Sequence, residues 1–338
     1  MRTKIIATIG PTSESEAVLK KFIAEGMDIA RMNFSHCTHV EYRVRKEKII
    51  RIAKKFKKHV KILQDLKGPR IRVGILPENG VVLNDGDIIL FSTAKKVPKG
   101  AIFIDDEHVH KDVKIGHPIF LANGSMELIV TKISGTTITT KVIRGGTLYS
   151  RKAVNMPHTM LTTSGLTDKD IEDVKFGIKE GVDYIALSFV QSEKDIMNLR
   201  AIVGTKAKIV AKIESAIALK HIDRIIKASD AIMVARGDLG VEIPMEKVPF
   251  IQKNLIRHAA WHGKSAIVAT QMLSSMIDHA HPTRAEVSDI ANAVWDGADA
   301  VMLSDETASG QYPVESIVAM KKIVAEAEHS HFDRENIL

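Results

Sequence analysis

The feature that most constrains this fold is a repeated alternation of short apolar runs with longer helical runs. The apolar runs are rich in β-branched and small residues and have the length of buried parallel strands. Eight of them are present, at residues 4–10, 29–35, 60–66, 184–189, 208–214, 231–236, 266–271 and 299–304. Eight strand–helix units predict an α/β protein with a closed (β/α)8 TIM barrel. A doubly wound sheet is the alternative, but it would need two winding directions and usually has fewer units.

The alternation is interrupted once, after the third strand. Residues 74–157 contain short alternating runs with no helical period, and turn sequences occur at residues 84–87 and at Asn123-Gly124. Such a pattern is typical of all-β structure. We therefore expect a discontinuous catalytic barrel of residues 1–73 and 158–338, with residues 74–157 inserted as a small β-barrel-like lid domain.

Composition indicates a globular protein with an anionic ligand. Lys and Arg exceed Asp and Glu by 48 − 41 = 7, and the calculated pI is about 9.2. The charges are scattered, without a basic block among aromatics, so we expect phosphorylated substrates rather than nucleic acid. Cys37 is the only cysteine, which is typical of a reducing compartment. No run has the length of a membrane span or signal peptide, so we expect a cytoplasmic protein without membrane contact.

Polar residues follow six of the predicted strands. Active sites of TIM barrels lie at the C-terminal ends of the strands. The residues at these ends are Arg31, Asn33, Ser35, Asp65, Lys212, Glu214, Gly237, Asp238, Thr270, Gln271, Ser304 and Glu306. Lys212 and Glu214 taken alone could be a plain ion pair that closes a strand. The convergence of so many polar groups on one barrel mouth favours a ligand site instead.

The residue types at this mouth suit phosphoryl transfer. Glu214 and Asp238 offer hard oxygen ligands, which suit Mg²⁺ or Mn²⁺, and no His/Cys spacing indicates zinc. Arg31 has the forked geometry that binds phosphate, and Lys212 adds a second cation. Backbone N–H groups at Gly237 could receive a carboxylate. Phosphoryl transfer depends mainly on positioning and charge neutralisation, which such a pocket provides.

Many short motifs resemble those of the pyruvate kinase family, over nearly the whole chain. They are Ala7-Thr8-Ile9-Gly10-Pro11, Ala30-Arg31-Met32-Asn33-Phe34-Ser35-His36, Asp65-Leu66-Lys67-Gly68-Pro69, Ser150-Arg151-Lys152, Lys212-Ile213-Glu214, 233–242, Ala269-Thr270-Gln271-Met272-Leu273, 282–289 and 299–304. The resemblance implies transfer of the phosphoryl group of phosphoenolpyruvate to ADP, giving pyruvate and ATP. It also implies that the inserted domain is a mobile lid, whose closure excludes water and so limits hydrolysis.

The resemblance assigns roles to individual residues. The implied catalytic residues are Lys212, Thr270 and Arg31, and the implied substrate-binding residues are Arg31, Lys212, Gly237, Asp238 and Thr270. The implied nucleotide-binding residues are Arg72, Lys152, His36 and Asn33. Glu214 and Asp238 would hold the divalent metal. Thr270 lies where the enolate is protonated, directly or through water.

One departure from the family pattern concerns a monovalent cation. In many members K⁺ is held by the positions of Asn33, Ser35, Asp65 and Leu66, and a glutamate accompanies it. Here Arg70 occupies the position of that glutamate. A guanidinium there could supply a fixed positive charge in place of K⁺, whereas the alternative is that Arg70 merely faces solvent. We predict activity that does not require K⁺.

A second departure is at the C-terminal end. Most relatives continue into a third α/β domain with a sugar-phosphate effector site, whereas only His329–Leu338 follow the last predicted helix. We therefore expect a short form without that C-terminal domain and without activation through it, which could still form a homo-oligomer through barrel contacts. Two other functions are considered: a metal-dependent lyase or aldolase acting on pyruvate enolate, and a catalytically inactive barrel used as a binding module.

Overall fold

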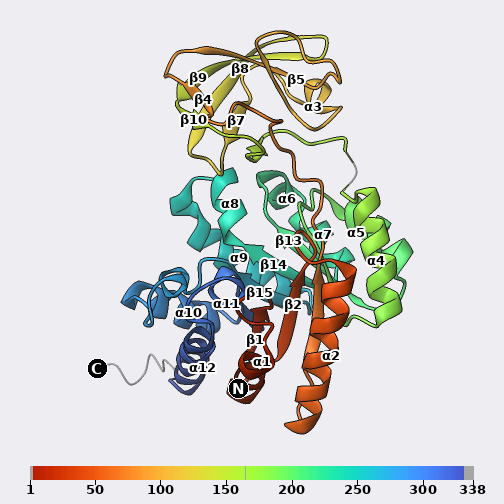
Figure 1. Cartoon of the computed structure of the whole chain (residues 1–338), viewed down its shortest axis with the longest axis vertical. Coiled ribbons are helices and arrows are strands. Elements are labelled where there is room, and N and C mark those ends of the chain that lie inside the picture. Colours follow the sequence, from red (N-terminus) through yellow and green to blue (C-terminus); the bar gives the residue numbers. More distant parts are fainter. Residues whose placement is uncertain (1–2, 164, 331–338) are drawn as a thin grey trace.

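The chain forms a closed barrel of parallel strands (Figure 1), seen in a computed structural model that describes residues 3–163 and 165–330. The strand order around the barrel is β1-β16-β15-β14-β13-β12-β3-β2. The strands are β1 (Lys4–Thr8), β2 (Ile29–Asn33), β3 (Lys61–Asp65), β12 (Tyr184–Leu187), β13 (Lys208–Ile213), β14 (Ala231–Ala235), β15 (Ser265–Ala269) and β16 (Ala300–Leu303). The predicted TIM barrel is confirmed, and the doubly wound alternative is wrong because β1 pairs with β16 and closes the sheet.

The helices surround the barrel on its outer side or lie at the end that faces the lid (Figure 1). They are α1 (Glu16–Glu25), α2 (His39–Lys55), α4 (Asp168–Glu180), α5 (Glu193–Val203), α6 (Ala216–Lys220), α7 (Ile222–Ala228), α8 (Arg236–Glu242), α9 (Val248–Trp261), α10 (Arg284–Trp295), α11 (Asp305–Ala308) and α12 (Pro313–His329). The 3₁₀ turn η1 (Met245–Lys247) precedes α9, and the 3₁₀ turn η2 (Ser274–Ile277) follows β15. Helices α2, α4 and α10 are each preceded by a threonine N-cap that forms a capping box, in which side chains satisfy free N–H groups at the start of the helix. These threonines are Thr38, Thr167 and Thr283.

The barrel strands divide their side chains between two apolar cores. In β13, Val210 faces the interior of the barrel, whereas Ile209 and Ala211 face the surrounding helices. Side chains two residues apart in a strand share a face. The face of Val210 therefore continues through Lys212 to Glu214, which brings both charges to the mouth of the barrel.

The inserted segment forms a separate, mainly antiparallel unit with its own core, in which only β5 and β6 pair in parallel among the described strands. Its elements are β4 (Val81–Leu83), β5 (Ile88–Ser92), β6 (Ala101–Phe103), α3 (Val109–Asp112), β7 (Pro118–Leu121), β8 (Met126–Ser134), β9 (Thr137–Arg144), β10 (Gly146–Leu148) and β11 (Val154–Asn155). Six strands pair in the order β11-β7-β8-β9-β5-β6, and β10 pairs with β4. A hydrophobic cluster from Ile71 to Met156 fills this unit. We call it the lid. It contains the single-turn helix α3, which the all-β interpretation did not include.

The lid is joined to the barrel by two adjacent chain segments. Arg72 forms a bridge with Ala153, and the amide of Val73 donates to the carbonyl of Lys152 at 2.9 Å. Figure 1 shows the lid beyond the end of the barrel where α6 and α8 begin. Its tip approaches α8, since a Cβ atom placed on Gly124 would lie 3.3 Å from the Val241 side chain. The lid therefore covers the mouth to which the barrel strands point.

Two expectations about the chain as a whole concern its membrane contact and its C-terminal tail. Across residues 3–163 and 165–330, every helix is too short or too polar to cross a bilayer. The predicted tail, His329–Leu338, lies outside the described residues from position 331 onward. Figure 1 places the described end of α12 on the side of the barrel away from the lid.

Candidate active site

Lys212 is the centre of the polar array at the barrel mouth. Its Nζ atom lies 2.9 Å from Glu214 Oε1 and 3.4 Å from Asp65 Oδ1, and it donates to Ser188 Oγ at 2.7 Å. Burial alone would lower the pKa of Lys212, but the carboxylates of Asp65 and Glu214 outweigh burial and raise it. Lys212 is therefore a permanent cation at the end of β13.

Arg31 joins the array from β2. Its Nε atom donates to Asp65 Oδ2 at 2.7 Å, and its Nη1 atom donates to Thr8 Oγ1 at 2.9 Å. Burial works to raise the pKa of Asp65, but Lys212 and Arg31 lower it overall. Asp65 thus stays ionised between two cations, and it fixes both cationic side chains beside one another.

The negative charge of the Glu214 carboxylate is only partly compensated by the positive charge of Lys212. Burial raises the pKa of its carboxyl group, Lys212 lowers it, and the charge of Asp238 raises it again, so that the result is a raised pKa. Its Oε2 atom accepts a hydrogen bond of 2.6 Å from the amide of Phe189. A divalent cation between Glu214 and Asp238 would remove this repulsion, so the two carboxylates fit Mg²⁺ or Mn²⁺ held together with substrate and water oxygens.

No larger set of ligands surrounds these two carboxylates. Among the residues that the structure describes, no three His, Cys, Asp or Glu side chains are grouped so that they could hold a metal ion. Zinc sites in proteins usually have three or four such ligands. Mg²⁺ does not need such a group, because it is commonly bound through one or two carboxylates and substrate phosphates.

Thr270 has an unusual backbone conformation at the end of β15. Its φ angle is +66° and that of Gln271 is +54°, and a β-branched residue rarely adopts this left-handed region. The hydroxyl of Thr270 donates to the carbonyl of Ala269 at 2.6 Å and accepts a hydrogen bond of 2.7 Å from the amide of Gly237. The structure therefore brings Thr270 and Gly237 together, next to Asp238 on α8.

Arg70 lies at the junction of the lid and the barrel. Its Nη2 atom is 3.6 Å from Asp238 Oδ1 and donates to Asn123 Oδ1 of the lid at 3.4 Å. Within the described residues its buried Nε atom has no hydrogen-bond partner, and no hydrogen bond or ion pair joins Arg70 to Asn33 or Asp65. The positive charge of Arg70 therefore stands beside the predicted metal ligand Asp238.

The predicted monovalent-cation residues lie on the neighbouring strands. Asn33 pairs in register with Asp65, and its Oδ1 atom accepts a hydrogen bond of 3.1 Å from the amide of Ser35. The carbonyl of Leu66 accepts a hydrogen bond of 2.8 Å from the hydroxyl of Ser188. His36 follows on the exposed turn after β2. Asn33 thus lies beside Asp65, whereas the carbonyl of Leu66 contacts the same Ser188 hydroxyl that Lys212 contacts.

A large cleft separates the lid from the barrel mouth. It has a volume of about 1110 Å³, and its lining includes Gly237 and Asp238 from the barrel and Gly124 and Arg144 from the lid. A smaller pocket of about 300 Å³ opens beside it, and its cationic residues are Arg70, Arg72, Arg151 and Lys152. The predicted nucleotide residues of the lid are thus brought together in one basic pocket, which suits an anionic ligand.

Comparisons with known proteins show the family of the chain. A sequence profile described as the pyruvate kinase barrel domain matches residues 1–317. A pyruvate kinase of Clostridium perfringens is 43% identical over 97% of this chain and 70% of its own length. The chain belongs to the pyruvate kinase family. Members of this family are phosphotransferases, and the resemblance seen in the sequence is confirmed.

Other pyruvate kinases are similar to nearly the whole of this chain. The pyruvate kinase of Sporosarcina psychrophila is 45% identical over 97% of this chain and 57% of its own length, and that of Agrobacterium vitis is 44% identical over 98% and 71%. A solved pyruvate kinase from Cryptosporidium parvum superposes with a TM-score of 0.94 at 39% identity, covering 98% of this chain and 70% of that one. The chain thus spans between 57% and 71% of the length of these pyruvate kinases.

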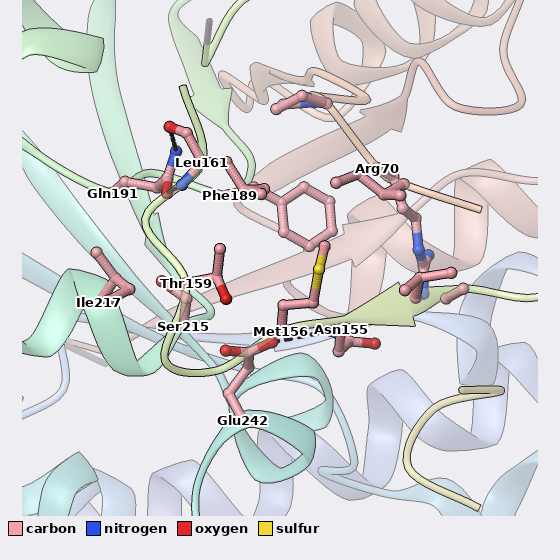
Figure 2. Close-up of a pocket in the computed structure, with 14 residues that line it drawn as sticks. Arg70, Asn155, Met156, Thr159, Leu161, Phe189, Gln191, Ser215, Ile217 and Glu242 are labelled. Carbon is pink, nitrogen blue, oxygen red and sulfur yellow. Dashed lines mark hydrogen bonds between the residues drawn. The ribbon is translucent and has the colours of Figure 1, made fainter. Parts of the chain in front are cut away.

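A small cavity of about 60 Å³ lies where the lid returns to the barrel (Figure 2). Figure 2 shows Met156 and Phe189 side by side in it, with Glu242 below them. Asn155 Nδ2 of β11 donates to Glu242 Oε1 of α8 at 3.1 Å. This hydrogen bond fastens the last lid strand to the helix that carries Asp238, and it was not foreseen from the sequence.

Replacing Glu242 with glutamine is expected to raise the midpoint of thermal unfolding at pH 8 and to leave it nearly unchanged at pH 5. Burial raises the pKa of Glu242 to about 7. The folded protein thus retains a proton that the unfolded chain releases near pH 4.3, so stability falls as pH rises between these values. Glutamine preserves the acceptor for Asn155 but cannot ionise. Calorimetry in metal-free buffer from pH 5 to 8 measures this, and an identical pH dependence in both proteins would contradict it.

Proposed function

We propose that the protein transfers the phosphoryl group of phosphoenolpyruvate to ADP, giving pyruvate and ATP. The observation that carries this proposal is the array of Arg31, Lys212 and Glu214 at the mouth of a pyruvate kinase family barrel. Glu214 interacts with Asp238, and Asp238 lines the cleft beside the basic lid pocket. The proposal includes the residue roles given by the resemblance. It also includes the requirement for a divalent metal.

Arg31 and Lys212 would neutralise the negative charge of the phosphoryl group during its transfer. A terminal oxygen of ADP attacks phosphorus, and the bond from phosphorus to the enol oxygen of phosphoenolpyruvate breaks. The electron pair of that bond remains on the enolate oxygen, which Lys212 is placed to stabilise. Mg²⁺ or Mn²⁺ held by Glu214 and Asp238 would supply further positive charge when bound. Asp65 keeps both protein cations in place, since it contacts Arg31 and Lys212 at once.

The enolate must then gain a proton on its methylene carbon to become pyruvate. Thr270 stands at the end of β15 with its hydroxyl linked to the first turn of α8. We assign it the delivery of that proton, directly or through a water molecule. The lid would exclude bulk water from the cleft, so that the phosphoryl group reaches ADP rather than water. Arg72 and Lys152 would bind the nucleotide from the basic pocket, with His36 and Asn33 on the barrel side.

The test is coupled pyruvate formation from phosphoenolpyruvate, ADP and Mg²⁺, with ATP measured in parallel. Equal amounts of pyruvate and ATP are expected. Pyruvate released without ADP would favour the enolate lyase or aldolase instead. The absence of any turnover, together with binding of phosphoenolpyruvate, would favour the inactive binding module.

Activity without K⁺ is expected in a Tris-buffered assay. Arg70 places a permanent positive charge 3.6 Å from Asp238, so a monovalent cation is not needed to balance the carboxylates of the mouth. Added KCl should change the rate by less than about twofold, and Arg70→Gln should make the rate rise with KCl. Tetramethylammonium chloride serves as the control for ionic strength. Stimulation of the parent protein many-fold by KCl alone would contradict this prediction.

Three further expectations remain predictions. They are a cytoplasmic location, a homo-oligomer formed through barrel contacts, and the domain boundaries at residues 73/74 and 157/158. The lid core begins with Ile71 and ends with Met156, which supports boundaries close to these positions.

A further inference from the structure

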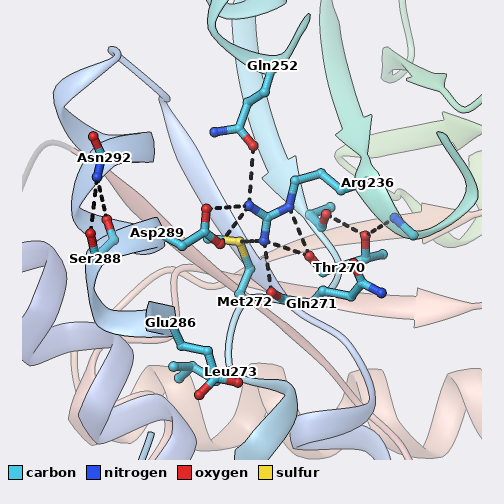
Figure 3. Close-up of polar contacts among 12 residues, drawn as sticks. Arg236, Gln252, Thr270, Gln271, Met272, Leu273, Glu286, Ser288, Asp289 and Asn292 are labelled. Carbon is cyan, nitrogen blue, oxygen red and sulfur yellow. Dashed lines mark hydrogen bonds and ion pairs between the residues drawn. The ribbon is translucent and has the colours of Figure 1, made fainter. Parts of the chain in front are cut away.

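A buried arginine next to the proposed site has contacts that the proposed reaction does not use. Arg236, the first residue of α8, is only 8% exposed. Figure 3 shows its guanidinium surrounded by acceptors from three other segments of the barrel. Its Nη2 atom donates to the carbonyls of Thr270 and Gln271, each at 2.9 Å. Its Nε atom also donates to the carbonyl of Thr270, at 3.2 Å.

The opposite edge of the guanidinium is held by a carboxylate. Arg236 Nη1 lies 2.8 Å and 2.7 Å from the two oxygens of Asp289, on α10, and 3.3 Å from Gln252 Oε1, on α9. A buried cation is costly unless it is paired and hydrogen-bonded. Asp289 compensates the charge of Arg236, so that the planar fork can remain fixed against the two carbonyls.

The two carbonyls belong to the two residues with left-handed backbone conformations at the end of β15. Such conformations cost about 1–3 kcal/mol each for residues other than glycine and persist only where the surroundings impose them. Arg236 contacts both Thr270 and Gln271 through their backbone, whereas the Thr270 hydroxyl faces Gly237. The forked guanidinium is suited to two successive carbonyls in a way that a lysine ammonium is not.

We propose that Arg236, held by Asp289, is the positioning residue that keeps Thr270 in its left-handed conformation and so directs its hydroxyl. Arg236 does not touch the substrate in this proposal. Arg236 acts through Thr270. The proposal rests on the proposed function only in the role given to the Thr270 hydroxyl. Displacements of about 1 Å can cost about 100-fold in rate, so the geometry set by Arg236 bears directly on turnover.

The kinetic test combines Arg236→Lys with Thr270→Ala, singly and together. Arg236→Lys is expected to lower kcat by about 10- to 100-fold while the half-saturating concentrations of phosphoenolpyruvate and Mn²⁺ change by less than about threefold. In the Thr270→Ala background, Arg236→Lys should lower kcat by less than about twofold, because the effects of substitutions at residues that act as a unit are not additive. Full additivity of the two losses would overturn the proposal.

The matched control is Arg200→Lys. Arg200 also contacts a carboxylate, Asp230, and two backbone carbonyls, of Gly204 and Ala207, but it lies at the opposite end of the barrel. The substitution Arg200→Lys should lower the midpoint of thermal unfolding and leave kcat within about twofold of the parent value. If Arg236→Lys does not fold, Asp289→Asn removes the compensating charge and should lower kcat in the same direction; an unchanged kcat would overturn the proposal.

Crystal structures of the parent and of Arg236→Lys provide a readout that does not depend on turnover. The proposal expects Thr270 to leave the left-handed region in the variant and its hydroxyl to lose the amide of Gly237. Retention of both features would overturn the proposal, whether or not the protein forms pyruvate. A parent that forms no pyruvate but shows this change in the variant would refute the proposed function and leave the positioning role intact.

Discussion

Replacing Lys212 with methionine is expected to lower kcat for pyruvate formation by about 10³-fold, with only a small change in the half-saturating concentration of phosphoenolpyruvate. The ammonium group is the one that Asp65, Glu214 and Ser188 jointly fix at the end of β13. Its charge is needed most when the enolate oxygen becomes negative, so the loss falls on kcat. Methionine keeps most of the side-chain volume, and Arg31 continues to pair with Asp65.

The control for this prediction is Lys208→Met. Lys208 begins the same strand but is exposed at its other end, so its replacement should leave the rate unchanged. Steady-state kinetics of the two variants, with circular dichroism to confirm folding, make the comparison. A Lys212→Met protein that is folded and retains more than about a tenth of the parent kcat would exclude the proposed role of Lys212.

Replacing Glu214 with glutamine is expected to weaken Mn²⁺ binding by about 100-fold. The change removes one of the two negative charges that the metal would neutralise, but the side chain keeps its shape. The amide oxygen can still accept the hydrogen bond from Phe189, as the carboxylate does now at 2.6 Å. Because Lys212 would lose one of its carboxylate partners, its cation would also repel the metal more strongly.

Titration of Mn²⁺ by electron paramagnetic resonance measures this affinity without any turnover. Glu172→Gln is the matched control, since Glu172 lies exposed on α4 and its replacement should not change Mn²⁺ binding. Equal Mn²⁺ affinities of the parent and of Glu214→Gln would show that the metal is not held at Glu214. In that case Asp238 would need other partners, and the site would have to be assigned afresh.

The barrel was predictable because its strands are buried on both faces. In β13 and β14 nearly every side chain is buried, so the runs are almost wholly apolar, and the charges of Lys212 and Glu214 stand out at the end of one of them. The turns of the lid were also predictable. Residues 84–87 connect β4 to β5, and Asn123-Gly124 connects β7 to β8, as the turn sequences indicated.

Some residues of the site were missed because their signal is weak or distant. Ser188 follows β12 and accepts a hydrogen bond from Lys212, and the rule applied to the other strand ends would have found it. Arg236 could not be found in this way, because its role depends on partners 16 to 53 residues further along the chain. The contact of Arg70 with Asp238 is likewise a product of tertiary folding.

The pairing of β1 with β16 has a consequence for the order in which a growing polypeptide can fold. Lys4 pairs with Ala300, so the barrel cannot close until nearly the whole barrel sequence has left the ribosome. Until then β1 offers an unpaired edge, which is a site of aggregation. The lid core draws only on residues between Ile71 and Met156, so it can assemble while synthesis continues. The nascent chain would thus carry a finished lid on an open sheet, and chaperones would be needed mainly during translation of its second half.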